Sequence, residues 1–141
     1  MSLTSPGLSV FFTVSIDAEF DLGAWNSISG LGMNIQTRAR DDSAMTFFQH
    51  HLPSHIDYPH ITLSRFVVSS STDVLNWLSA YHLLPIPTVG EICCVDQSGS
   101  TIASWQMIGI SPVKWVGPTL DAGAALSAPT EKLEIAHMGF L

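Results

Sequence analysis

Positive charge is scarce in this sequence, which has five Lys and Arg against twelve Asp and Glu and a net charge of −7. Binding to nucleic acid depends on clustered cations that displace counterions from phosphates, and an anionic membrane attracts the same kind of cluster. Here the cations are scattered along the chain, at Arg38, Arg40, Arg65, Lys114 and Lys132. The sequence therefore predicts no nucleic-acid-specific binding and no attraction to an anionic membrane.

Charge of either sign is also low, at 12% of residues, while apolar residues make up 46%. A monomer with so few charges would expose large apolar patches. We therefore expect much of the surface to be covered by further copies of the chain or by other partners.

Disulfide and membrane signals are missing as well. The two cysteines, Cys93 and Cys94, are adjacent, so in a strand they point to opposite faces and cannot bridge. No apolar run approaches the roughly 18 residues of a membrane span. The N-terminal residues carry no positive charge before an apolar run, so we expect no signal peptide and no stable membrane anchoring.

Catalytic and cofactor motifs are equally hard to find. Residues 30–32 read Gly-Leu-Gly, but Ile35 stands where a dinucleotide fingerprint needs a third glycine. No phosphate-loop or nucleophile-elbow motif occurs, and no spacing singles out a Ser-His-Asp triad. We therefore expect no enzyme activity and no cofactor. We interpret residues 21–33 as a glycine-rich corner between strands, with Trp25 packed into one end of the core.

Apolar periodicity predicts one domain, residues 1–141, that is mainly β with one helix. Alternation marks strands such as 10–16 and 33–40, whereas residues 71–83 repeat apolar side chains at helical spacing. Ser70 and Asp73 have the spacing of a capping box at the start of that helix. About six or seven strands with one helix are typical of a β-sandwich or barrel. The expected core residues are Trp25, Trp77, Leu78, Trp115, Leu133 and Ile135.

Residues 41–60 show no clear period and contain two prolines, so we expect a long loop between strands. Its apolar side chains would be sticky in a free monomer, and we expect neighbouring subunits to cover them. The predicted contact residues in and beside this loop are Arg40, Phe47, Phe48, Leu52, Pro53, Tyr58 and Pro59.

Two clusters keep a metal-binding or small-ligand-binding β-domain as the alternative function. Asp17, Glu19 and Asp21 would share one face of a strand and could bind a divalent cation. Imidazole is a common zinc ligand, and four histidines gather between residues 50 and 60. The competing interpretations, a charged strand end and solvated or interface histidines, are favoured because no complete ligand motif is present. The four are His50, His51, His55 and His60.

Several short motifs, in order, resemble the tail-tube proteins of contractile phage tails and of phage-tail-like contractile injection systems. The resemblance extends from about Phe11 to Phe140. The motifs are Leu22-Gly23-Ala24-Trp25, Ser29-Gly30-Leu31, Leu52-Pro53 and Tyr58-Pro59 before Ile61-Thr62-Leu63, a helix with Trp77, Trp115 before Gly117-Pro118, and Leu133-Glu134-Ile135-Ala136-His137.

This resemblance implies a β-sandwich or half-open barrel with one helix, whose subunits form hexameric rings that stack into a hollow tube. The implied partners are other copies of the chain, a surrounding sheath protein, baseplate or hub proteins, tube-terminating proteins and any cargo in the lumen. The implied site of assembly is the bacterial cytoplasm, within a tail or particle that can be released from the cell.

The sequence departs from the family pattern beside the predicted contact loop. Ser54 and His55 replace a basic, Gly-containing segment, His60 stands where Asn is usual, and Phe66 stands where Gly is common. These departures leave two roles open at the level of the sequence: a bulk tube subunit, and a specialised ring at the baseplate or at the end of the tube.

Overall fold

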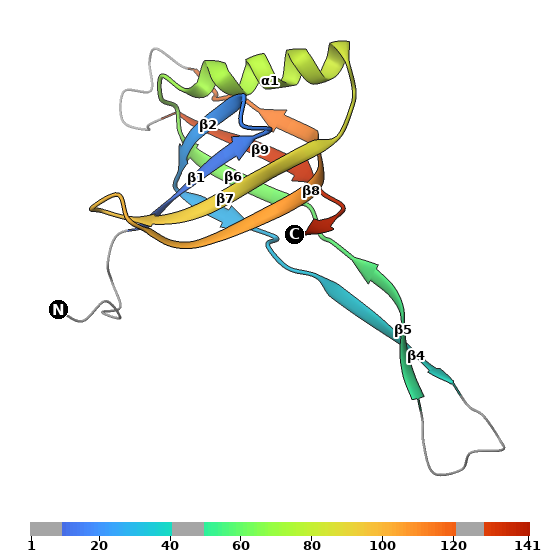
Figure 1. Cartoon of the computed structure of the whole chain (residues 1–141). Coiled ribbons are helices and arrows are strands. Elements are labelled where there is room, and N and C mark those ends of the chain that lie inside the picture. The colour runs from blue at the N-terminus through green and yellow to red at the C-terminus, as the bar shows by residue number, and fades with distance from the viewer. Residues whose placement is uncertain (1–9, 41–49, 121–128) are drawn as a thin grey trace.

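The computed structural model describes residues 10–40, 50–120 and 129–141 and shows ten strands and one helix there. The mainly β fold with one helix agrees with the prediction (Figure 1). The elements are β1 (Val10–Ile16), β2 (Phe20–Trp25), β3 (Ser27–Ser29), β4 (Asn34–Arg40), β5 (His50–Asp57), β6 (Ile61–Phe66), α1 (Ser71–Leu83), β7 (Thr88–Asp96), β8 (Thr101–Val116), β9 (Thr130–Ala136) and β10 (Gly139–Phe140).

An eight-stranded antiparallel sheet forms the body, in the order β2-β1-β7-β8-β9-β6-β3, with β10 added beside β8. Its two outermost strands, β2 and β3, are separated along the chain by Asn26 alone. The Asn26 backbone N–H donates to the Ser64 carbonyl, and its side-chain oxygen accepts from the Phe66 N–H. The continuous segment β2–β3 thus pairs with β1 through β2 and with β6 through β3. This brings the two edges of the sheet together and curls it into a half-open barrel (Figure 1).

This segment corrects the interpretation of residues 21–33 as a corner between strands. Most of the stretch is strand, because each part finds a separate partner in the sheet, β1 for β2 and β6 for β3. Trp25 ends β2 with its side chain in the core, 1% exposed.

Strand β8 connects the two sides of the barrel. It is 16 residues long, and its first part pairs with β7 while its last part pairs with β9. Gly109 has a φ of 64°, which few other residues adopt, and a Cβ there would lie 2.6 Å from the Met138 side chain. The part that pairs with β7 and the part that pairs with β9 thus belong to one continuous strand.

The core consists of inward-facing side chains from every long strand of the barrel and from helix α1 (Ser71–Leu83). Alternation along a strand places these side chains on its inward face. Full burial of each large apolar side chain stabilises the fold by about 1.5–3 kcal/mol. The fully buried apolar residues are Val14, Ile16, Leu22, Trp25, Ile61, Leu63, Val74, Ile92, Met107, Ile110, Leu133 and Ile135.

The helix α1 spans Ser71–Leu83, as the periodicity predicts. It lies over one end of the barrel (Figure 1) and buries Val74 and Trp77 there. The expected capping box does not form, because Ser70 makes no side-chain cap bond to the helix and its hydroxyl instead lies 3.4 Å from the Arg65 Nη1 atom.

Strands β4 and β5 form a separate two-stranded sheet that projects from the barrel (Figure 1), and we call it the arm. The prediction of a loop over 41–60 is wrong for residues 50–57, which form β5. These residues pair with β4 rather than with the barrel, so they need no apolar face toward the core. Pro53 lies beside a register shift in the ladder, where a missing N–H is tolerated. Residues 41–49, including Phe47 and Phe48, lie outside the described residues.

Candidate assembly surface

The base of the arm has one apolar and one polar face. Ile35 and Ile56 are directly paired across the two strands, so their side chains lie on the same face, and they are 56% and 43% exposed. On the other face the His55 imidazole and the Gln36 amide both contact the Asp57 carboxylate. A two-stranded ribbon with one exposed apolar face is only marginally stable alone, which makes this face a candidate for burial by a partner.

The two chain segments that connect the arm to the barrel pass very close to each other at Gly30. Gly30 has a φ of 88°, and a Cβ there would lie 2.0 Å from the His60 carbonyl oxygen. Only glycine fits this crossing without a backbone shift. The direction of the arm therefore depends on Gly30.

Tyr58, directly after β5, anchors the arm to its own barrel. Its ring lies 5.1 Å from the His137 ring and 5.9 Å from the Phe140 ring, measured between centroids. His137 is 7% exposed, and burial lowers the pKa of its imidazole from the ordinary value of 6.5, with the Gly139 carbonyl partly opposing the shift. The neutral form is thus favoured at the base of the arm.

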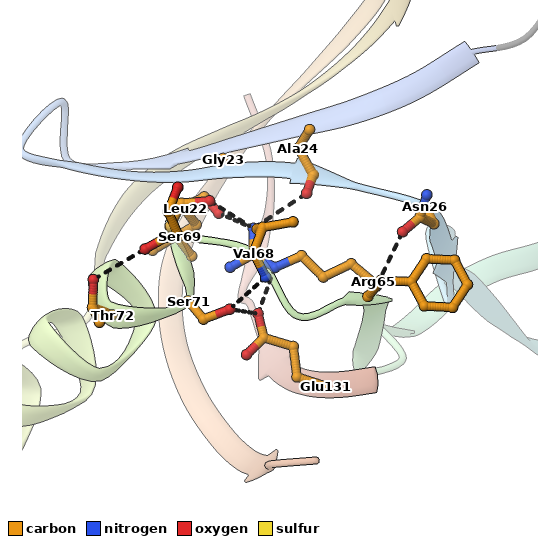
Figure 2. A network of polar contacts seen from close by, with 12 residues as sticks. Leu22, Gly23, Ala24, Asn26, Arg65, Val68, Ser69, Ser71, Thr72 and Glu131 are labelled. Carbon is orange, nitrogen blue, oxygen red and sulfur yellow. Dashed lines mark hydrogen bonds and ion pairs between the residues drawn. The ribbon is translucent and has the colours of Figure 1, made fainter. Parts of the chain in front are cut away.

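A buried ion pair holds the barrel together beneath α1. Arg65 and Glu131 are 3% and 0% exposed, and the Arg65 Nε–H donates to a carboxylate oxygen of Glu131. Figure 2 shows that the guanidinium also reaches the carbonyl oxygens of Leu22 and Ala24, at 2.6 and 3.2 Å from Nη1. Its Cζ atom lies 3.9 Å from the centroid of the Trp25 ring.

This ion pair fills the gap where the barrel is half open. The guanidinium on β6 takes the place of a neighbouring strand for two carbonyls of the edge strand β2, while Ser71 at the start of α1 donates to Glu131 at 3.0 Å (Figure 2). Sequence reasoning missed both charges. Arg65 is two positions after Leu63, and Glu131 two before Leu133, so strand alternation alone places them inward.

The two candidate ligand clusters are arranged differently from the expectation. Asp17 does not continue a strand, because Asp17 and Ala18 have φ values of 54° and 55° and form a turn between β1 and β2. The face shared by Asp17, Glu19 and Asp21 is thus not present. His60 approaches Glu134 at 3.7 Å. Among the residues that the structure describes, no three His, Cys, Asp or Glu side chains are grouped to hold a metal ion.

The structure separates the predicted contact residues from the predicted core residues. Arg40 lies in β4 and Leu52 and Pro53 lie in β5, while Tyr58 and Pro59 are half-buried at the base of the arm. Trp25, Trp77, Leu133 and Ile135 are buried, and Leu78 and Trp115 are partly buried against the same core. Within the described ranges, no helix is long and apolar enough to span a membrane.

Residues 8–141 match the family model of the T4-like virus tail tube protein gp19. The chain belongs to this tail tube family. The matched range includes the barrel, the helix and the arm. A search of curated proteins finds no matching sequence.

Solved structures share the fold at low sequence identity. A chain in the baseplate of the anti-feeding prophage has a TM-score of 0.70 and 18% identity, with 100% of this chain and 96% of that chain covered. A chain in the PVC sheath-tube complex, from an extracellular contractile injection system, has a TM-score of 0.71 and 20% identity. The comparison covers 92% of this chain and 86% of that chain. The PVC sheath/tube terminator has a TM-score of 0.71 and 19% identity, with 99% of this chain and 98% of that chain covered.

Proposed function

We propose that this tail tube protein forms hexameric rings, and that the rings stack into the hollow inner tube of a contractile phage tail or injection system. In this proposal a sheath surrounds the tube, and contraction of the sheath drives the tube through a target envelope. Membership of the tail tube family supports a structural rather than an enzymatic role.

The exposed apolar face of the arm is the observation that carries the proposal. Ile35 and Ile56 lie on a ribbon that projects from the barrel, where the described residues give them no core to pack against (Figure 1). A neighbouring subunit, in the same or the next ring, would bury this face. The proposed contact residues beyond these two remain Arg40, Phe47, Phe48, Leu52, Pro53, Tyr58 and Pro59.

Relatives of the same fold come from a baseplate, a sheath-tube complex and a sheath/tube terminator. By analogy we propose that sheath, baseplate and tube-terminating proteins are the partners of this chain, with assembly in the bacterial cytoplasm. Phe66, where the family commonly has glycine, is 53% exposed at the end of β6. An exposed aromatic side chain at this position supports a specialised ring, which contacts a different neighbour from the one that a ring of the bulk tube contacts.

Electron microscopy and size-exclusion chromatography of the purified protein test this proposal. We expect rings and stacked hollow tubes that grow with protein concentration. A protein that stays monomeric at high concentration, and whose melting temperature rises on addition of Zn²⁺ or Ca²⁺, would contradict the tube and support the alternative of a metal-binding domain.

A further inference from the structure

Two surface patches of opposite charge lie on opposite sides of the barrel. Thr62, Lys114, Val116, Lys132 and Glu134 line a groove of about 150 Å³ across β6, β9 and β8. Ser15, Asp17, Val89, Glu91, Gln106 and Leu141 line part of a pocket of about 220 Å³ beside β1 and β7. We call these the basic groove and the acidic pocket.

Among the residues that the structure describes, Lys114, Lys132, Asp17 and Glu91 of the two patches form no ion pair. Both lysines are exposed, and neither forms an ion pair with a described residue. Glu134, the cross-strand neighbour of Lys114, approaches His60 at 3.7 Å. In the acidic pocket, Glu91 accepts only a weak bond from the Cys93 thiol at 3.1 Å, and no cation of the described ranges pairs with Asp17 or Glu91. Each patch therefore has charge available for an intermolecular pair.

The strand order sets the two patches apart. Around the barrel the sequence of strands is β2/β3, β1, β7, β8, β9, β6, so β1 lies across from β9 and β7 lies across from β6. The acidic pocket is on β1 and β7, and the basic groove is on β9 and β6. The two patches therefore lie on different sides of the barrel, and each can contact a different neighbouring subunit.

The acidic pocket and the Lys132 end of the basic groove lie toward the end of the barrel that α1 covers. Ser71 of α1 donates to Glu131, the residue before Lys132. On the other side, Asp17 and Thr88 border a second pocket together with Trp77 and Tyr81 of α1. Opposite positions at a similar level suit a head-to-tail contact between copies, and contacts of this kind close into a ring when the rotation fits.

We propose that the basic groove of one subunit docks against the acidic pocket of the next subunit in the ring. Lys132 and Lys114 then face Glu91 and Asp17 of the adjacent copy, which pairs four charges that have no ion-pair partner among the described residues of one subunit. This inference rests on the proposed ring assembly and adds which sides of the barrel meet.

Charge reversal tests the contact, with assembly measured by size-exclusion chromatography and electron microscopy. Lys132→Glu and Glu91→Lys each place like charges across the contact, so we expect each variant alone to lose at least about tenfold in assembled fraction, because like charges in a contact are strongly unfavourable. A 1:1 mixture of the two variants, and the double variant K132E/E91K, should both assemble again, since each then restores opposite charges at every contact.

The matched control is Glu134→Lys, which changes the net charge by the same amount as Glu91→Lys but makes the basic groove more basic. We expect this variant to assemble like the parent, and all variants to melt close to the parent because the side chains lie at the surface. Single variants that assemble normally, or a mixture that does not recover, would overturn the proposed contact while leaving the tube intact. A parent protein that never assembles would instead contradict the proposed function itself, and this inference with it.

Discussion

Isoleucines of the barrel are buried and isoleucines of the arm are exposed, although both regions are built from antiparallel strands. Ile92 on β7 and Ile135 on β9 are 0% exposed, whereas Ile35 on β4 and Ile56 on β5 are 56% and 43% exposed. The barrel strands share a closed interior, while the arm has one layer and no described element behind it (Figure 1). The comparison indicates that the barrel strands have a shared core, and it supports our proposal that the arm is stabilised by intermolecular packing.

The largest expected effect concerns the barrel. Glu131→Ala leaves the buried Arg65 guanidinium without its carboxylate, and we expect a loss of about 3–5 kcal/mol in the free energy of unfolding, measured by urea denaturation. The double variant R65M/E131L removes both charges and should lose clearly less than the single variant. A single variant as stable as the parent would show that this ion pair does not hold the half-open side of the barrel.

The next effect concerns the junction between barrel and arm. Gly30→Ala places a Cβ 2.0 Å from the His60 carbonyl in a left-handed backbone conformation, so we expect a loss of roughly 1–3 kcal/mol and a redirected arm. Gly32→Ala is the control, because its Cβ would meet no atom within 4 Å. If thermal melting places both variants at the same temperature, the close crossing at Gly30 is not needed.

The smallest effect is a dependence on pH. Burial lowers the pKa of His137 below its ordinary 6.5, so the unfolded chain takes up a proton more readily than the folded one. The stabilisation is complete above pH 6.5 and is lost as the pH falls toward the lowered pKa. We expect this loss of stability to be the smallest of the three effects, because a single imidazole is responsible for it. Urea midpoints at pH 7.5 and 5.5 should differ less for His137→Phe than for the parent. Equal differences would rule out His137 as the source.

Helix α1 and most barrel strands could be predicted from sequence because their apolar side chains face one core. Val74 and Trp77 repeat at helical spacing, and Leu133 and Ile135 alternate. In the arm, alternation predicted β4 but not β5, since β5 pairs with β4 away from the core and its side chains follow no core-facing period.

The candidate site was also predicted only in part. The apolar content of residues 41–60 led to the prediction of a subunit contact, which stays a prediction, but it gave no sign of the two-faced base formed with Ile35. The inward Arg65 and Glu131 broke the usual rule that charges face solvent, and only their spacing from Leu63 and Leu133 could have revealed them. The family itself came from motif resemblance, because periodicity alone specifies a barrel but not a tube.

The most direct test of the account is the double variant Ile35→Ser/Ile56→Ser, studied by thermal melting and by electron microscopy of the same preparation. We expect a melting temperature within a few degrees of the parent and a complete loss of tubes, because the apolar face of the arm is exposed in the subunit and, in our proposal, becomes buried on assembly. Asn34→Ser, on the polar face of the same ribbon, should form tubes normally. Normal tubes from the double variant, or an unfolded barrel, would contradict the assignment of the arm as the assembly surface.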